Sequence, residues 1–254
     1  IQATHKYGFH KEGSYPVAFN LGAEYYLNTM FDDELKKANT KTYQEMMFEA
    51  AELPYKKEKF SLILEQKDKE YASNFVKKNK IKEKEIIGIH MGASPRWPSK
   101  VWAEEKIFEF IEKARKEGYG ILLFGGPNEI NSHEDLVKKL LANNVHVYRN
   151  NPHNTKREFL SLLNLCSAFV CGDSFSLHAS IGLGKHTLAL FFCTSPDEIE
   201  GYGLLTKIVS PMLRDFFPER SNEYNKELVN SISADQVLQA VISSLKRNKN
   251  AQNT

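Results

Sequence analysis

From Ile86 onward the sequence alternates short apolar runs with amphipathic segments, and this alternation constrains the fold more than any other feature. Such an order predicts a parallel sheet whose strands are joined by helices, a Rossmann-like α/β domain. The segment GILLFGG at 120–126 is apolar throughout, as expected of a strand covered by helices on both faces. The expected strands span 86–90, 120–126, 146–149, 168–172, 187–193 and 207–210. The expected helices span 104–118, 132–142, 156–165, 177–182 and 234–247.

The first 82 residues follow a different pattern. They predict helices at 24–31, 43–53 and 67–79, but only one strand, at 60–64, which is too little sheet for an independent domain. We therefore divide the chain into a partial, mostly helical remnant of a second domain with a linker at 1–82, and a Rossmann-like domain at 83–254. The lysines between 56 and 84 alternate with glutamates, which favours a solvated helical face over a membrane-surface patch.

Composition narrows the class of protein. With 254 residues, 41% hydrophobic and 26% charged, the chain is expected to be globular. A formal net charge of +2 gives no reason to expect nucleic-acid binding. Cys166, Cys171 and Cys193 match neither zinc-site nor disulfide spacing, so buried thiols in a reducing compartment are expected.

No apolar run approaches the ~20 residues of a spanning helix, and the start lacks signal-peptide order, which predicts a cytoplasmic protein. The chain starts with isoleucine, so residue 1 need not be the natural start.

Ligands of an open parallel sheet bind beyond the carboxyl ends of its strands. The loop after the first expected strand, HMGASPRWPSKVW at 90–102, carries the features of a phosphate site. Gly92 permits close backbone approach, Ser94 offers a hydroxyl, and Arg96 and Lys100 supply two cations near a helix start. This combination suits a diphosphate. The alternative is a surface loop with ordinary charges.

The loop after the second expected strand is FGGPNE at 124–129. The two oxygens of the Glu129 carboxylate match two adjacent ribose hydroxyls. The alternative is that Glu129 only complements the positive helix end, a contribution of ~0.3–1 kcal/mol.

The third loop, GDSFSLH at 172–178, suggests a serine nucleophile at first sight. Serine esterases with a Gly-Asp-Ser signature carry it near the chain start and end with an Asp-x-x-His pair, and this chain has neither arrangement. The histidines after Ser174 are His178 and His186, and neither follows an aspartate at that spacing. We therefore favour a strand-to-helix turn in which Asp173, Ser174 and His178 face a phosphate-binding crevice. The alternative for His178 is a histidine packed between helix and sheet.

In order and spacing, these three loops and EGYG at 200–203 resemble the nucleotide-sugar-binding half of the family 9 glycosyltransferases, the lipopolysaccharide heptosyltransferases. The resemblance covers residues 86–211. KYGF at 6–9 and KKANTKTYQE at 36–45 resemble the end of that family's acceptor domain. The resemblance implies the GT-B arrangement, in which two Rossmann-like domains face each other and the second holds the donor.

The resemblance also implies roles for individual residues. One departure is Phe175, which stands where the family has glycine after Asp-Ser or Asp-Thr, and its side chain could change the space for the donor sugar. The implied contacts to the donor diphosphate are Ser94, Arg96, Lys100, Ser174 and His178, and those to ribose or sugar are Glu129 and Asp173.

The function expected from the resemblance is inverting transfer of a heptose-like sugar from a nucleoside-diphosphate sugar to a lipopolysaccharide or related glycan. No metal or other cofactor is expected, because Lys100, Arg96 and helix N-termini can stabilise the departing diphosphate. The family's general base is an aspartate early in the acceptor domain, outside this chain. Asp32 and Asp33 are the nearest carboxylates, but their setting resembles a helix start. The alternative is a non-catalytic sugar-nucleotide-binding relative.

The expected partners are the nucleotide-sugar donor and a glycolipid or oligosaccharide acceptor, without nucleic acid. A lipid-linked acceptor would place the protein at the inner face of the inner membrane.

Overall fold

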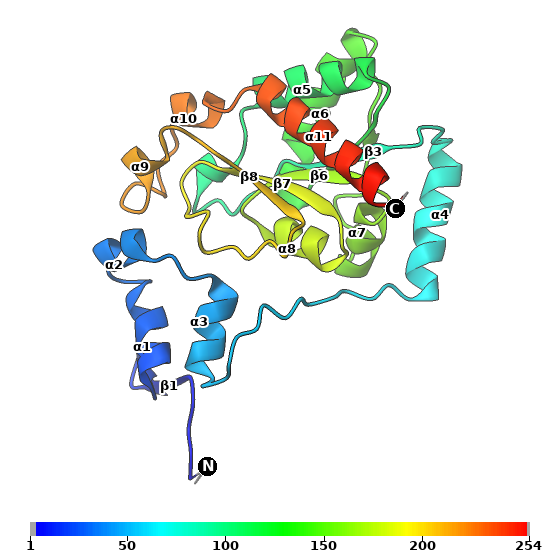
Figure 1. Ribbon diagram of the computed structural model, residues 1–254. Helices are drawn as coiled ribbons and strands as arrows, with labels where there is room; N and C mark the ends of the chain where they lie inside the picture. The colour runs from blue at the N-terminus through cyan, green and yellow to red at the C-terminus, as the bar shows by residue number, and fades with distance from the viewer. Residues whose placement is uncertain (1–3, 253–254) are drawn as a thin grey trace.

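The computed structural model describes residues 4–252 and contains a six-stranded parallel sheet, which confirms the predicted fold class (Figure 1). The strand order is β5-β4-β3-β6-β7-β8, and every neighbouring pair is parallel. The strands are β3 Ile86–His90, β4 Gly120–Phe124, β5 Tyr148–Arg149, β6 Ala168–Gly172, β7 His186–Phe191 and β8 Leu205–Val209. All six predicted strands are present, although β5 has two residues where four were expected.

Helices cover both faces of the sheet because alternate residues of each strand point to opposite sides. On one face α5 (Glu104–Lys116), α6 (Ile130–Ala142) and α11 (Ala234–Gln252) pack against alternate strand residues such as Ile87 and Ile89. On the other face, α7 (Lys156–Leu163) and α8 (Phe175–Gly182) pack against strand residues such as Phe169. Figure 1 shows these two layers on either side of the strands. The five predicted helices are confirmed, with ends shifted by up to five residues.

Shorter elements of the sheet domain were not predicted. They are the 3₁₀ turns η1 (Pro98–Lys100) and η2 (Pro127–Glu129) and the helices α9 (Leu213–Phe216) and α10 (Lys226–Asn230). Each has five residues or fewer, too short to show a helical period in the sequence.

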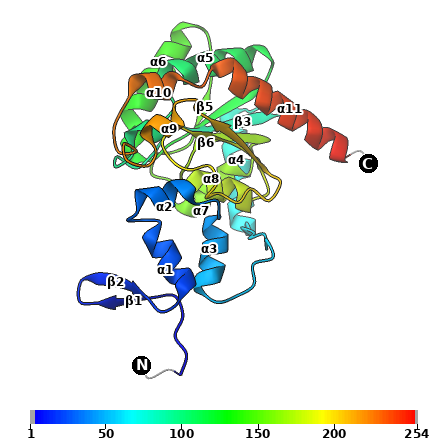
Figure 2. The same ribbon diagram turned by 60° about the vertical axis from the view of Figure 1, so that its left-hand side comes forward.

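The three helices predicted in the N-terminal part are also present. They are α1 Leu21–Asn28, α3 Tyr43–Ala50 and α4 Gln66–Asn79, and α2 Asp33–Ala38 lies between the first two. A hairpin of β1 (Phe9–Glu12) and β2 (Tyr15–Ala18), joined through Gly13 at φ +58°, was not predicted. Figure 2 shows this hairpin projecting from the N-terminal helices, away from the sheet domain.

The strand predicted at 60–64 is wrong. This segment belongs to an extended connection between α3 and α4 that runs along the sheet domain without joining a sheet (Figure 1). Its apolar side chains pack instead against the end of α8, where a methyl group on Gly182 would lie 2.6 Å from the Phe60 ring. The Leu62 N–H donates to the Gly182 carbonyl at 2.8 Å, one hydrogen bond in place of a strand ladder.

Two hydrogen bonds between Tyr43 and Glu198 attach α3 to the sheet domain. The Tyr43 N–H donates to the Glu198 carbonyl at 2.9 Å, and the Tyr43 hydroxyl donates to the Glu198 carboxylate at 2.7 Å. Burial raises the pKa of both Tyr43 and Glu198. These bonds hold the N-terminal helices against the loop that follows β7.

Helix α4 packs against α7 of the sheet domain. Arg157 forms an ion pair with Asp68, and the Asn154 amide donates to the Tyr71 hydroxyl at 2.6 Å. Although α4 lies before residue 83, its contacts are therefore with the sheet domain. The proposed division at 82/83 stays a prediction.

A second ion pair anchors the strand edge opposite the candidate site. Arg115 Nη1 lies 2.6 Å from one Glu83 oxygen, and the Tyr148 hydroxyl lies 2.8 Å from the other. Burial opposes ionisation of Glu83, but these hydrogen bonds outweigh it and lower its pKa to about 2. The three cysteines are buried and free, as predicted. Over the part of the chain described, no helix combines the length and apolarity needed to cross a bilayer.

Candidate functional site

A cavity of about 410 Å³ lies at the carboxyl ends of the central strands. The loops after β3, β4 and β6 all reach it and contribute Ser94, Glu129 and Ser174 respectively. The sequence predicted that these three loops converge, and the structure confirms it. The segment after β5 closes one side with Asn150 and Pro152, and Phe159 and Phe175 add aromatic surface.

Glycines let the loops after β3 and β4 approach each other. A methyl group on Gly92 would lie 2.8 Å from the carboxylate carbon of Glu129, so a larger residue there would displace the end of that side chain. Glu129 also accepts a hydrogen bond from the Gly126 N–H at 2.7 Å, which closes the turn η2. Glu129 therefore interacts with the N-terminal end of its own helix, as the alternative interpretation proposed. It also lines the cavity.

Lys100 and Asp173 form an ion pair between the loops after β3 and β6. Their Nζ and Oδ2 atoms are 2.8 Å apart, and the side chains are only 13% and 16% exposed. Lys100 Nζ also lies 4.6 Å from the centre of the Trp97 ring. Neither Lys100 nor Asp173 lines the cavity itself, but Asp173 directly precedes Ser174, which does.

Gly172 allows the chain at Lys100 to cross the end of β6. A methyl group on Gly172 would lie 2.4 Å from the Lys100 carbonyl oxygen, which is closer than real atoms approach. The glycine in the GDS sequence is therefore required by the backbone packing that positions Lys100.

The two remaining candidates for a phosphate contact, His178 and Arg96, also lie outside the cavity lining. His178 is partly buried, and burial lowers its pKa, an effect that the carboxylate of Asp173 opposes and the Lys100 cation reinforces. It is thus placed beside the ion pair, outside the cavity lining. Arg96 is exposed, with its guanidinium 4.8 Å from the Trp97 ring centre, and it does not line the cavity.

Ser174 lacks the partner that a nucleophile needs. It occupies the N-cap position of α8, and its Oγ lies 2.8 Å from the Ser176 hydroxyl. Among residues 4–252 no histidine forms a hydrogen bond with it. The serine-hydrolase alternative is left without a general base.

Asp32 has the structural role that its setting predicted. Its side chain caps α2 by accepting the Leu35 N–H at 3.0 Å, and Asp33 is the first residue of the helix. Within the part of the chain described, no three His, Cys, Asp or Glu side chains are arranged as a metal site.

Two residues of the site were not identified from the sequence. His90 ends β3 with its Nδ1 buried and unpartnered, and burial, together with nearby His133, lowers its pKa to about 4. The sequence signal that could have identified His90 is its position, as a polar residue, at the end of the apolar segment 86–90. Asn150 bonds both the N–H and the carbonyl of Gly125 at 3.0 Å, and no pattern in the sequence indicated it.

Comparison with known proteins places this geometry in a family. The family model for glycosyltransferase family 9 (heptosyltransferase) matches residues 1–227. Lipopolysaccharide heptosyltransferase 2 of Salmonella typhimurium is 28% identical over 116 residues, covering 45% of this chain and 33% of that protein. The Escherichia coli protein of the same name gives the same identity and coverage.

Solved structures agree on the fold. The Escherichia coli ADP-heptose lipopolysaccharide heptosyltransferase II has a TM-score of 0.64 at 22% identity, covering 79% of this chain and 57% of that one. A family 9 glycosyltransferase from Veillonella parvula has a TM-score of 0.68 at 18% identity, covering 82% and 61%. The chain thus spans less than two thirds of the length of these relatives, and its fold matches a GT-B-type sheet domain with part of a second domain. Because the family model matches 227 of the 254 residues, the chain belongs to glycosyltransferase family 9.

Proposed function

We propose that the sheet domain binds a nucleoside-diphosphate sugar and that the protein transfers the sugar to a glycan acceptor. The observation that carries this proposal is the convergence of three strand-end loops on one cavity next to the Lys100–Asp173 ion pair. In an open parallel sheet this edge is where nucleotides bind. We call the cavity lined by Ser94, Glu129 and Ser174 the donor cavity.

In this proposal the diphosphate lies between the loops after β3 and β6. The Lys100 ammonium, the Ser94 hydroxyl and the N–H groups at the start of α8 supply positive charge and hydrogen-bond donors. Lys100 would exchange part of its contact with Asp173 for the phosphate oxygens. Glu129 would accept hydrogen bonds from ribose, and Asp173 and His178 would lie on the sugar side.

The charge that develops on the leaving diphosphate would be stabilised by protein cations without a metal. Lys100 is positioned for this by Gly172 and Trp97. Arg96 would contribute after moving from its exposed position on Trp97. The general base for inverting attack would come from a part of the protein outside this chain.

For the transferred sugar we propose a heptose on a nucleoside diphosphate, with lipopolysaccharide precursor as acceptor. The names of the similar heptosyltransferases support this proposal. Phe175, which is 55% exposed and lines the donor cavity, would limit the space for the sugar. A lipid-linked acceptor would bring the protein to a membrane surface.

A thermal-melting experiment tests donor binding. ADP, GDP and UDP are added to the wild-type protein, to Lys100→Ala and to Lys116→Ala, a control lysine on α5. We expect one nucleotide to raise the Tm of the wild type and of the control, and to raise that of Lys100→Ala much less. Equal shifts in all three proteins, or no shift with any nucleotide, would contradict the proposal.

The second candidate is a sugar-nucleotide-binding relative without transferase activity, and the observation on its side is that Asp32, the nearest carboxylate considered as a base, caps α2 instead. The full-length protein is incubated with ADP-heptose and a lipopolysaccharide precursor. Release of ADP that depends on the acceptor supports the enzyme. Donor binding without release supports the binding protein.

A further inference from the structure

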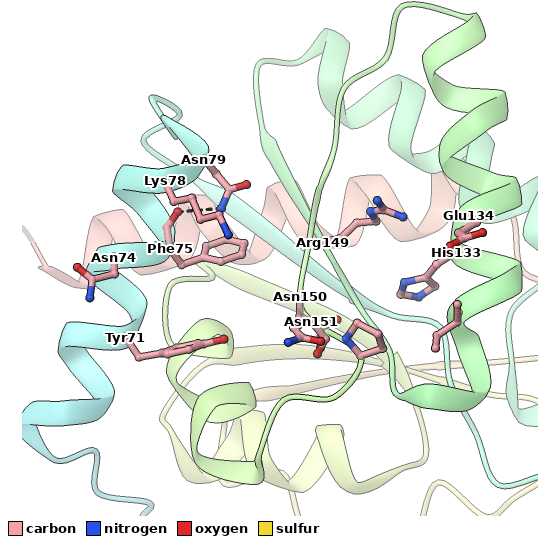
Figure 3. Close-up of a pocket in the computed structure, with 12 residues that line it drawn as sticks. Tyr71, Asn74, Phe75, Lys78, Asn79, His133, Glu134, Arg149, Asn150 and Asn151 are labelled. Carbon is pink, nitrogen blue, oxygen red and sulfur yellow. Dashed lines mark hydrogen bonds between the residues drawn. The ribbon is translucent and has the colours of Figure 1, made fainter.

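Five exposed lysines gather where helix α4 ends and the chain turns toward β3 (Figure 1). Helix α4 lies on the outside of the sheet domain, and Figure 3 shows Lys78 on its last turn, at one side of a cavity of about 590 Å³. We call this set the lysine cluster. Its members are Lys77, Lys78, Lys80, Lys82 and Lys84. None of the five forms an ion pair within residues 4–252.

The glutamates that alternate with these lysines in the sequence do not share their exposure. From 80 to 85 the lysine positions are exposed, and the partly buried positions between them are Ile81, Glu83 and Glu85. Glu83 is bound by Arg115 and Tyr148 of the sheet domain, and its side chain is 17% exposed. The alternation of charges along the sequence is therefore not an alternation of charges on the surface.

The acidic residues of α4 lie in its first half. Asp68 is buried and forms an ion pair with Arg157 of α7. Glu70 is exposed, seven residues before Lys77, which is a distance of about 10 Å along a helix. This distance is about one Debye length at 0.1 M salt, so Glu70 offsets the charge of the lysine cluster little. The end of α4 is therefore a positive surface in a chain whose formal net charge is only +2.

Lysines near the end of a helix can serve the helix alone, because cations there complement the partial negative charge of its last carbonyl groups. This accounts for Lys77 and Lys78, which stand in the last turn of α4. It does not account for Lys82 and Lys84, which follow the C-cap residue Lys80. The exposed charge of the segment after the helix is therefore left for a partner.

We propose that the lysine cluster docks the protein on an anionic lipid bilayer. About four to eight clustered lysines or arginines are typical of such surfaces, and each strengthens binding about fivefold near a charged membrane. Nucleic acid is disfavoured, because segment 77–85 has no aromatic side chain on which a base could stack and the net charge is low.

The position of the lysine cluster is compatible with donor binding. The cluster precedes β3, so it lies at the amino ends of the strands, while the donor cavity lies at their carboxyl ends. A bilayer held at the lysine cluster therefore leaves the donor cavity open. This surface adds to the proposed transferase and does not depend on it.

Vesicle sedimentation tests the surface on the whole chain. The protein is mixed at low salt with vesicles of phosphatidylcholine, either alone or with phosphatidylglycerol as the anionic lipid. The test variant combines Lys80→Gln, Lys82→Gln and Lys84→Gln. The control variant combines Lys11→Gln, Lys156→Gln and Lys226→Gln, three exposed lysines on separate elements, so that the net charge falls equally.

We expect the wild type and the control to bind the anionic vesicles with affinities within about threefold of each other. The test variant should bind about 100-fold more weakly, because three contributions of about fivefold are lost. Binding should weaken as salt is added, since it depends on exposed charges.

Three results would overturn the proposal. The first is that the wild type binds the anionic vesicles no better than the neutral ones at low salt. The second is an equal loss of binding in the test and control variants, both shown by their Tm to be folded, which would make the net charge the cause. The third is tighter binding to double-stranded DNA than to the vesicles, lost in the test variant, which would assign the cluster to nucleic acid. The vesicles hold neither sugar nucleotide nor glycan, so a failure of donor binding would count against the transferase alone.

Discussion

We expect the Lys100–Asp173 ion pair to contribute measurably to stability, and a double-mutant cycle tests this. The variants are Lys100→Met, Asp173→Asn and the combination of both. The pair is short, at 2.8 Å, and its side chains are 13% and 16% exposed. Exposed pairs contribute ~0.2–1 kcal/mol, and breaking a fully buried pair costs ~3–5 kcal/mol. A pair of this intermediate exposure should lie between these limits, so Lys100→Met should lower the free energy of unfolding by about 2 kcal/mol.

The coupling energy is the decisive quantity. Removal of Lys100 leaves the Asp173 carboxylate partly buried without its cation, and Asp173→Asn relieves that cost. The double variant should therefore be more stable than the sum of the single effects by about 1–2 kcal/mol in urea unfolding. The surface pair Lys138–Asp135, 3.4 Å apart with side chains 72% and 63% exposed, is the matched control. Its coupling should be below about 0.5 kcal/mol. Equal coupling in the two cycles would refute the reasoning.

The same variants separate stability from ligand binding. ADP carries the diphosphate without a transferred sugar, so its affinity reports on Lys100 directly. We expect Lys100→Met to weaken ADP about tenfold or more, and Asp173→Asn to strengthen it, because the carboxylate competes with the phosphate for the ammonium. If Asp173→Asn weakened ADP as much as Lys100→Met, the competition would be excluded.

Three further predictions concern the framework around the site. The pKa of Glu83 is about 2, below its ordinary value of 4.5, so its stabilisation is complete above pH 4.5 and is lost as the pH falls toward 2. Glu83→Gln should flatten that part of the stability profile by about 1–2 kcal/mol after solvent screening, in urea titrations at pH 3 and pH 6. Gly172→Ala should lower the free energy of unfolding by more than about 2 kcal/mol and the Tm by several degrees, because its methyl group would lie 2.4 Å from the Lys100 carbonyl oxygen. An unchanged Tm would contradict the close packing of the Lys100 backbone on the end of β6. Tyr43→Phe should lower the free energy of unfolding by about 1–3 kcal/mol, because it removes a hydrogen-bond donor from the buried Glu198 carboxylate. It should also speed proteolysis of the connection at 54–65. Cleavage at the wild-type rate would show that this hydrogen bond does not hold the N-terminal helices.

The strands of the large sheet could be predicted because each is an uninterrupted apolar run between polar loops. The hairpin at 9–18 could not, because its strands are largely exposed and leave no alternation of burial in the sequence. The strand predicted wrongly at 60–64 has a different cause, because here the sequence does show an alternating apolar pattern. Its alternating apolar residues do pack, but against the end of α8 through single side chains, a contact that periodicity cannot distinguish from a strand.

The loops of the site were predictable for a topological reason: parallel strands bring their carboxyl ends to one edge. The contacts among those loops were not. Lys100 and Asp173 were each predicted to contact the donor. Their contact with each other joins residues 73 positions apart, so it appears only in the three-dimensional structure. His133 lies within a helix whose amphipathic pattern accounts for it as a packed residue. Its unpartnered nitrogen becomes visible only when the neighbouring edge strand is in place.

The GDS sequence illustrates how the same residues acquire different chemistry from their surroundings. A serine becomes a nucleophile when a base removes its proton. Ser174 meets instead another hydroxyl, that of Ser176, at the start of a helix whose N–H groups favour an anion. Asp173 pairs with the Lys100 ammonium at 2.8 Å and with no histidine in the described part of the chain. Ser174 and Asp173 therefore have a hydroxyl and an ammonium as partners, and neither has the histidine that bond cleavage by serine requires.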